Sequence, residues 1–159
     1  MKRTSHIAAA LWLAMAIPAI ASPGGGAHSH DGETAYGEPG DPSKPARVVN
    51  IAMREADGKM LFVPNQIEVR TGEQIRFVVR NNGELEHEIV VATFEENEKH
   101  AIEMRKNPDM EHDDPNARRL DSKKSGEMIW KFTKAGEFEF ACLIPGHRES
   151  GMHGKIVVK

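Results

Sequence analysis

The chain has 159 residues, 39% of them apolar and 28% charged, which is enough for one packed domain of ordinary size. Its 21 basic and 24 acidic residues give a net charge of −3, which argues against a general nucleic-acid binder. The single cysteine, Cys142, excludes an intrachain disulfide, a zinc ribbon and a CxxC redox motif. The eight histidines and eight methionines are the unusual feature of the composition.

Residues 1–21 have the features of an export signal. Lys2 and Arg3 precede an apolar stretch from Ile7 to Ile17, and residues 19–21 read Ala-Ile-Ala, a pattern that signal peptidase accepts. The apolar stretch is shorter than the roughly 20 residues of a membrane span. We therefore predict a cleaved signal peptide, a periplasmic protein and no membrane span after cleavage. Loss of the two cations takes the net charge from −3 to −5.

The mature chain divides into two parts of different composition. Residues 22–46 are dominated by Gly, Pro and Ser, so we predict a flexible arm that carries His28 and His30. From Arg47 onward the sequence has short β-type runs separated by turn residues, and we predict one folded domain over residues 47–159. The two arm histidines are candidates for metal capture, although they are also ordinary solvated polar residues.

The predicted domain is all-β. Several runs alternate apolar and polar residues, as in Ile75, Phe77 and Val79, which would share one face of a strand. Short strands at this spacing predict an antiparallel Greek-key β-sandwich or barrel. The candidate strands are Val48–Met53, Met60–Val63, Gln66–Arg70, Gln74–Arg80, Glu88–Ala92, Glu127–Thr133, Glu137–Cys142 and Lys155–Val158.

A polar, acidic insertion over about residues 93–125 interrupts the strands. Thr93 and Glu96 fit a capping box, and Asn107-Pro108 would end the helix that begins there. If the helix forms, His100 and Met104 lie on one face of it because they are four residues apart. We consider a second, labile copper site and a merely solvated insertion as alternatives. The candidate secondary ligands in this segment are His100, Met104, Met110 and His112.

The decisive stretch runs from Cys142 to Met152, with His147 halfway between them. Each residue alone is more simply explained by packing, because a buried Cys or Met commonly fills a core. Together, a thiolate, an imidazole and a thioether at five-residue intervals form a soft ligand set. Two imidazoles and one thiolate with a weak axial Met describe a blue-copper electron-transfer site, and the Met disfavours zinc. His87 at the start of a predicted strand is the best candidate for the second imidazole.

On these residues the sequence resembles the cupredoxins, the small single-domain type 1 copper proteins. The C-terminal stretch FACLIPGHRESGMHGKIVVK is similar to rusticyanin and to periplasmic cupredoxins linked to copper tolerance. The resemblance implies that His87, Cys142, His147 and Met152 bind copper. One position differs: Glu88 follows the first histidine, where many cupredoxins carry an Asn or Ser that ties the ligand loops together.

These features predict a copper-binding cupredoxin that cycles between Cu(I) and Cu(II), transfers electrons and serves copper tolerance. We expect a monomer that exchanges electrons with an unidentified redox partner protein and binds no nucleic acid. A plain electron carrier without a tolerance role is the main alternative. A copper-dependent oxidase is the weaker one, because such enzymes need several His-x-His pairs or a second domain, and this chain has one such pair.

Overall fold

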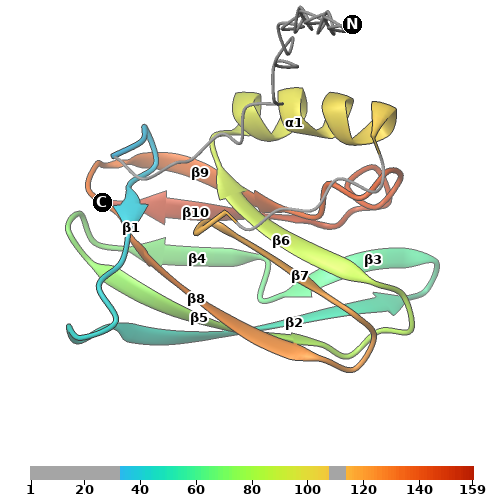
Figure 1. The fold of residues 1–159 in the computed structure, drawn as a ribbon, viewed down its shortest axis with the longest axis horizontal. Coiled ribbons are helices and arrows are strands. Elements are labelled where there is room, and N and C mark those ends of the chain that lie inside the picture. Colours follow the sequence, from blue (N-terminus) through green and yellow to red (C-terminus); the bar gives the residue numbers. More distant parts are fainter. Residues whose placement is uncertain (1–32, 108–113) are drawn as a thin grey trace, which may run out of the picture.

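The computed structural model describes residues 33–107 and 114–159. The described strands form two five-stranded sheets that pack face to face as a β-sandwich (Figure 1). The first sheet has the order β1 (Glu38–Pro39), β8 (Ser125–Lys131), β5 (Gln74–Asn81), β2 (Arg47–Ala56) and β3 (Lys59–Val63). The second has the order β4 (Gln66–Val69), β10 (His153–Val158), β9 (Gly136–Ala141), β6 (His87–Ala92) and β7 (Ala117–Leu120).

The core between the sheets follows the alternation in the sequence. Ile75, Phe77 and Val79 on β5 are all fully buried, which confirms the predicted inward face of this strand. Phe62 of the first sheet and Phe140 of the second meet edge to face, with ring centroids 5.1 Å apart. The predicted β-sandwich is therefore confirmed, and its apolar core extends towards the cysteine that follows β9.

The sheets are mixed rather than purely antiparallel, which corrects the predicted pairing. Strand β2 pairs with β5 in parallel, and β4 pairs with β10 in parallel. Alternation shows which face of a strand is buried, but it carries no information about the direction of the neighbouring strand. Between β2 and β5 the chain runs through β3 in one sheet and β4 in the other, and this crossover makes the parallel pair possible.

The segment from Glu33 to residue 46 packs on the domain, so the prediction of a flexible arm is wrong for this part of the chain. Tyr36 is 2% exposed, and its ring stacks on Trp130 with centroids 5.4 Å apart. The indole Nε1–H of Trp130 donates a hydrogen bond to the Tyr36 carbonyl oxygen at 2.9 Å. Composition missed this because one aromatic residue anchors an otherwise Gly- and Pro-rich segment. Residues 22–32 lie outside the described part.

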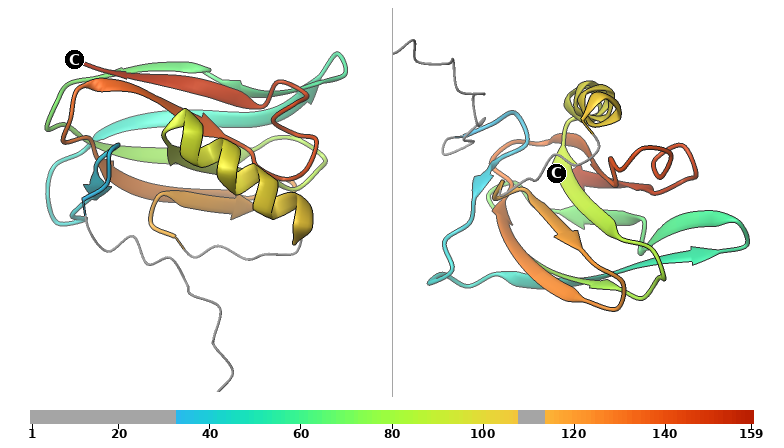
Figure 2. Two further views of the ribbon diagram at one scale, coloured as in Figure 1. Left: turned by 90° about the horizontal axis from the view of Figure 1, so that it is seen from above. Right: turned by 45° about the vertical axis from the view of Figure 1, so that its right-hand side comes forward.

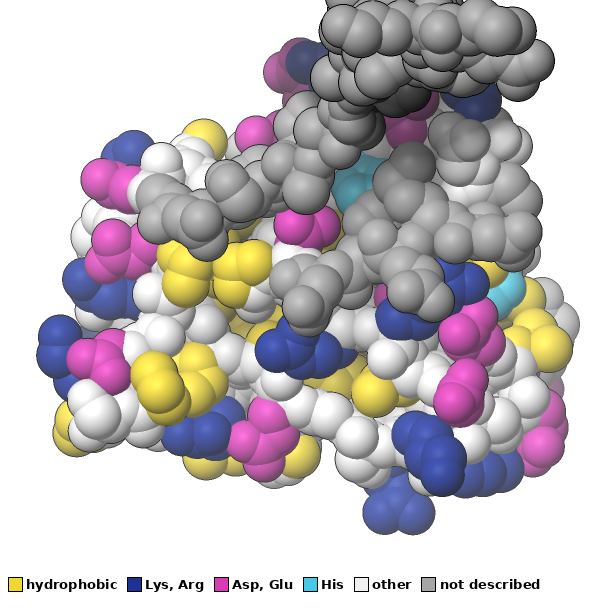
Figure 3. Space-filling view, viewed as in Figure 1, with side chains coloured by type: hydrophobic (Ala, Val, Ile, Leu, Met, Phe, Trp, Pro, Cys, Tyr) yellow, Lys and Arg dark blue, Asp and Glu magenta, His cyan; other side chains and the backbone are white. Residues whose placement is uncertain are grey.

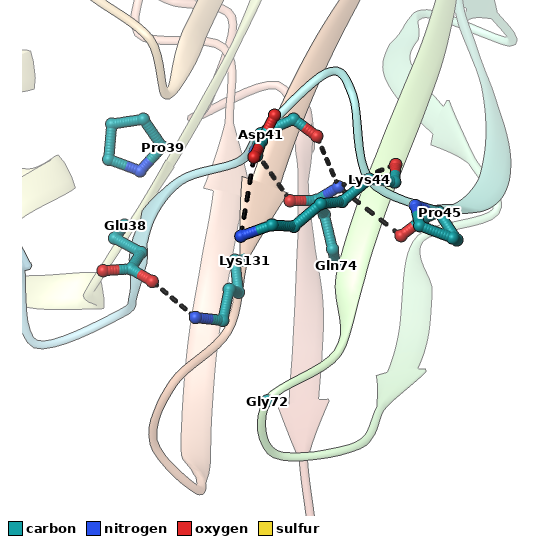
Figure 4. A pocket seen from close by; sticks show the side chains of 8 residues that line it. All are labelled: Glu38, Pro39, Asp41, Lys44, Pro45, Gly72, Gln74 and Lys131. Carbon is teal, nitrogen blue, oxygen red and sulfur yellow. Dashed lines mark hydrogen bonds and ion pairs between the residues drawn. The ribbon is translucent and has the colours of Figure 1, made fainter.

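Polar contacts complete the docking of this segment. The side-chain amide of Gln74 accepts a hydrogen bond from the Asp41 backbone N–H at 2.7 Å and donates one to the Asp41 carbonyl oxygen at 2.9 Å (Figure 4). Glu38 on β1 forms an ion pair with Lys131 on β8 at 2.6 Å. Because Gln74 lies mostly buried at the start of β5, these contacts fix the N-terminal segment to the edge of the first sheet.

The predicted helix forms as α1 (Phe94–Lys106) and covers the outer face of the second sheet (Figure 2). Thr93 and Glu96 make both hydrogen bonds of a capping box, and the helix ends at Asn107 as expected. Ala101 and Met104 pack in a second apolar cluster with Leu143 and neighbouring residues of the sheet. The helix therefore lies directly behind the strand that leads to Cys142.

The rest of the predicted insertion contains strand β7, which we did not predict. β7 pairs antiparallel with β6 and extends the second sheet by one strand. Its four residues include Arg118 and Arg119, so the strand has no apolar alternation to reveal it. Only its two end residues are buried. Tertiary pairing with β6, and not local propensity, therefore determines this element.

The surface carries both signs of charge. On the face shown in Figure 3, lysine and arginine side chains are interspersed with aspartate and glutamate. Within the described ranges, no helix is both long and apolar enough to cross a membrane. The predicted signal peptide, residues 1–21, lies outside these ranges.

Candidate metal centre

Four candidate ligands of the sequence analysis lie at one end of the sandwich. Cys142 directly follows β9, His147 lies in the loop between β9 and β10, and Met152 directly precedes β10. His87 is the first residue of β6, and in Figure 1 the start of β6 and the β9–β10 loop share the right-hand end of the molecule. Two adjacent strands of one sheet thus bring His87 to the loop, as predicted.

Three donor groups converge within this end of the sandwich. The Nδ1 atoms of His87 and His147 are 3.2 Å apart, and the Cys142 Sγ is 3.3 Å from the His147 Nδ1. One ligand atom from each of these residues lies within 4.8 Å of the others. Donor atoms bound at about 2.0–2.3 Å to one metal ion, with near-tetrahedral angles, stand about 3.3–3.6 Å apart. The spacing therefore fits a single metal ion.

Burial governs the chemistry of Cys142. Its side chain is fully buried, and desolvation raises the pKa of the thiol to about 12, while a hydrogen bond from the Glu88 backbone N–H opposes this rise. That N–H lies 3.4 Å from Sγ. The metal-free protein therefore holds a protonated thiol at neutral pH, and binding of a metal at Sγ must release this proton.

His87 and His147 differ in their surroundings. His87 is fully buried, and its second ring nitrogen, Nε2, lies 2.7 Å from the Glu55 carboxylate on β2. His147 is partly exposed, and its pKa is lowered by desolvation and by the neighbouring His87. Sequence reasoning missed Glu55 because it lies 32 residues before His87 and on the other sheet, and no local motif links the two.

Glu88 ties the ligand segments together at the position where the sequence departs from many cupredoxins. Its side chain is 1% exposed, and Oε1 accepts a hydrogen bond from the Leu143 backbone N–H at 3.0 Å. Its own backbone N–H donates to the Cys142 sulfur. Desolvation raises the pKa of this carboxyl group above its ordinary value. A glutamate at this position thus makes a hydrogen bond between the start of β6 and the β9–β10 loop.

Met152 lies in the same apolar cluster as Cys142 and is fully buried. Its backbone is fixed to the other candidate ligands, since the Met152 carbonyl oxygen accepts from the Cys142 N–H at 3.0 Å and its N–H donates to the His147 carbonyl oxygen at 3.1 Å. His153, its neighbour, is exposed at the start of β10. The backbone therefore holds Met152 close to Cys142 and His147, and the neighbouring histidine faces solvent.

Two of the six candidate secondary copper ligands, His100 and Met104, lie in the described ranges, both on α1. Met104 is fully buried and packs in the apolar cluster beneath α1. His100 lies partly exposed on the same helix. The helical spacing correctly placed the two on one side, but the sheet behind the helix buries Met104. The other secondary candidates, His28, His30, Met110 and His112, lie outside the described ranges.

Comparison with known proteins identifies the family. Residues 49–159 match the copper-binding proteins of the plastocyanin/azurin family. The chain belongs to this family. The cofactor of this cupredoxin is copper, in agreement with the donor set of two imidazoles and one thiolate.

Individual relatives support the same conclusion. This cupredoxin is 54% identical over 134 residues to the copper-resistant cuproprotein CopI of Rubrivivax gelatinosus, and the match covers 84% of this chain and 79% of that protein. It is 34% identical to the copper-resistant cuproprotein CopI of Pseudomonas aeruginosa, with 79% and 83% covered. The structure of auracyanin B has the same fold, with a TM-score of 0.64, 21% identity and coverage of 78% of this chain and 96% of that one.

Proposed function

We propose that this chain is an exported periplasmic cupredoxin that holds one copper ion, cycles it between Cu(I) and Cu(II) and transfers electrons to a partner protein. Its proposed ligands are His87, Cys142, His147 and Met152. The convergence of two imidazole nitrogens and one buried sulfur within 4.8 Å carries this proposal. Copper at this position supplies a one-electron redox couple, and the unpaired electron of the oxidised form is shared with the thiolate.

The residues around the donors serve this role by holding them rigidly. The Glu88 backbone N–H donates to the Cys142 sulfur, and the Cys142 N–H donates to the Met152 carbonyl oxygen. Because these hydrogen bonds fix the ligand segments, the ligand positions change little between oxidation states. Pro145 in the loop has no N–H to donate, which limits the hydrogen bonds that reach the sulfur. Of the four proposed ligands, His147 alone is partly exposed, and we infer that electrons enter and leave through its ring.

The direct test is the visible spectrum of the purified mature protein titrated with Cu(II). We expect one tightly bound equivalent to produce an intense thiolate-to-copper charge-transfer band. If Zn(II) is added first, more Cu(II) should be needed before the band appears, to the extent that Zn(II) competes for the same donors. A colourless complex with Cu(II) bound would contradict the type 1 assignment.

Replacement of Met152 with glutamine is expected to keep the copper and lower the reduction potential, because an oxygen ligand favours Cu(II) more than a thioether does. Cyclic voltammetry of the two proteins measures the difference. Met60→Gln is the matched control, since Met60 is only partly buried at the edge of the core. A higher potential in Met152→Gln, or a shift no larger than that of the control, would show that Met152 is not an axial ligand.

We further propose that the protein serves copper tolerance, because the relatives with the highest identity reported above are named copper-resistant cuproproteins. The proposed periplasmic location suits this role, and cell fractionation would test it.

We propose no independent enzymatic activity. An oxidase needs several His-x-His pairs or a second domain to form a catalytic copper centre, and the sequence has one such pair.

The tolerance proposal predicts that the mature chain binds more than one copper equivalent. Deletion of residues 22–32, which removes His28 and His30, or alanine at His100, Met110 and His112, should lower the stoichiometry and leave the charge-transfer band intact. The deletion stops before Glu33 because the following residues pack on the domain. Calorimetric titration measures the copper stoichiometry of each variant. Growth under copper stress of a strain that lacks the gene, complemented with each variant, measures copper tolerance. If all variants bind one equivalent and loss of the gene does not make the strain copper-sensitive, the tolerance proposal fails and the protein is a plain electron carrier.

A further inference from the structure

A carboxylate lies against the side of His87 that faces away from the other donors. Glu55 is the penultimate residue of β2, and its Oε1 lies 2.7 Å from the His87 Nε2. The histidine side chain is fully buried and that of Glu55 is 28% exposed. The two residues belong to different sheets, so this contact joins the sheets directly beside the copper site.

The turn before His87 holds this carboxylate in place. The backbone N–H groups of Glu84 and Leu85 donate to its two oxygens at 3.0 and 3.1 Å. A Cβ atom at Gly83 would collide with the same carboxylate, so the turn leaves room for it only because this residue is glycine. Buried Asn81 shapes the turn, because its side chain accepts from the Gly83 N–H at 2.9 Å and donates to the Leu85 carbonyl oxygen at 2.8 Å.

The hydrogen bond determines which nitrogen of His87 carries the proton. Both oxygens of the Glu55 carboxylate accept hydrogen bonds from backbone N–H groups, Oε2 from Glu84 and Oε1 from Leu85, so the carboxylate acts as the acceptor in this turn. A carboxylate oxygen in this acceptor role also accepts from the imidazole, so Nε2 of His87 is the donor and carries the ring proton. The lone pair of Nδ1 then points towards the His147 Nδ1, 3.2 Å away.

We propose that Glu55 is a positioning residue of the copper site, which fixes the metal-binding tautomer of His87 and lowers the reduction potential through its negative charge. This inference rests on the proposed function. Within residues 33–107 and 114–159, Glu55 forms no ion pair with a lysine or arginine that would neutralise it. Because Cu(II) carries one more positive charge than Cu(I), a nearby carboxylate stabilises the oxidised state more.

Two measurements test the proposal. In the metal-free protein, two-bond ¹H–¹⁵N correlations should show His87 protonated at Nε2, and this needs no variant. In the copper-loaded protein, Glu55→Gln should raise the reduction potential, since the glutamine oxygen still accepts from His87 but the charge is gone. Glu55→Ala, which removes the acceptor, should weaken copper binding about 10–100-fold and mix the tautomers.

Glu84→Gln is the matched control. Glu84 lies in the same turn, is 82% exposed and pairs with Lys123, so loss of its charge should move the potential less than Glu55→Gln does. Protonation of His87 at Nδ1 in the wild type, or equal shifts in Glu55→Gln and Glu84→Gln, would overturn the proposal. A wild type that binds Cu(II) without the charge-transfer band would overturn the proposed function instead. If Glu55→Gln does not fold, the wild-type tautomer still decides the positioning role.

Discussion

Replacement of Cys142 with serine is expected to abolish the intense visible band of the copper-loaded protein. The band requires a sulfur-to-copper transition, which a hydroxyl oxygen cannot supply. Cys142 is the only cysteine in the chain, so no other thiolate can replace it. Absorption spectra recorded at equal protein concentration, together with copper content by elemental analysis, separate loss of the band from loss of the metal.

Two further variants make this test specific. His153→Ala changes an exposed histidine next to Met152 and should keep the band, because the ring of His153 lies outside the donor group. His147→Ala removes a donor 3.3 Å from the sulfur and should change or abolish the band. Circular dichroism of each metal-free variant checks the fold. An unchanged spectrum in Cys142→Ser would refute the copper assignment of this site.

Replacement of Tyr36 with alanine is expected to lower the free energy of unfolding by about 3 kcal/mol, as for other large aromatic residues deleted from a core. The side chain is 2% exposed and stacks on Trp130, so its loss leaves a cavity against a fully buried indole. Urea unfolding of the metal-free protein, followed by tryptophan fluorescence, measures the change. The copper ligands are untouched, so the charge-transfer band should remain in the folded variant.

Tyr36→Phe is the control for this prediction. It keeps the ring and removes the hydroxyl that accepts a hydrogen bond from the Asn116 side chain at 3.3 Å, so we expect a loss of about 1 kcal/mol. A chain that begins at residue 47 should be destabilised at least as much as Tyr36→Ala, whereas one that begins at residue 33 should unfold like the full mature chain. Equal stability of these two truncated chains would contradict the docking of residues 33–46.

The copper ligands show how far local sequence extends. Cys142, His147 and Met152 lie within one loop, so their spacing alone indicated a soft metal site. His87 was found by a weaker argument, because only its position at the start of a strand suggested that it faces the loop. Glu55 was not found, since its contact with His87 joins residues 32 positions apart on two sheets.

Sequence by itself determined the features that depend on neighbours along the chain. The start of α1 follows from the Thr93–Glu96 capping box and its end from Asn107-Pro108, and the buried faces of the strands follow from alternation, because each is a local interaction or a period-two geometry. Tertiary structure alone decided the rest. The parallel pairing of β2 with β5, the docking of Tyr36 and the burial of Met104 depend on surfaces that distant segments provide, and no local pattern specifies which surface a segment will meet.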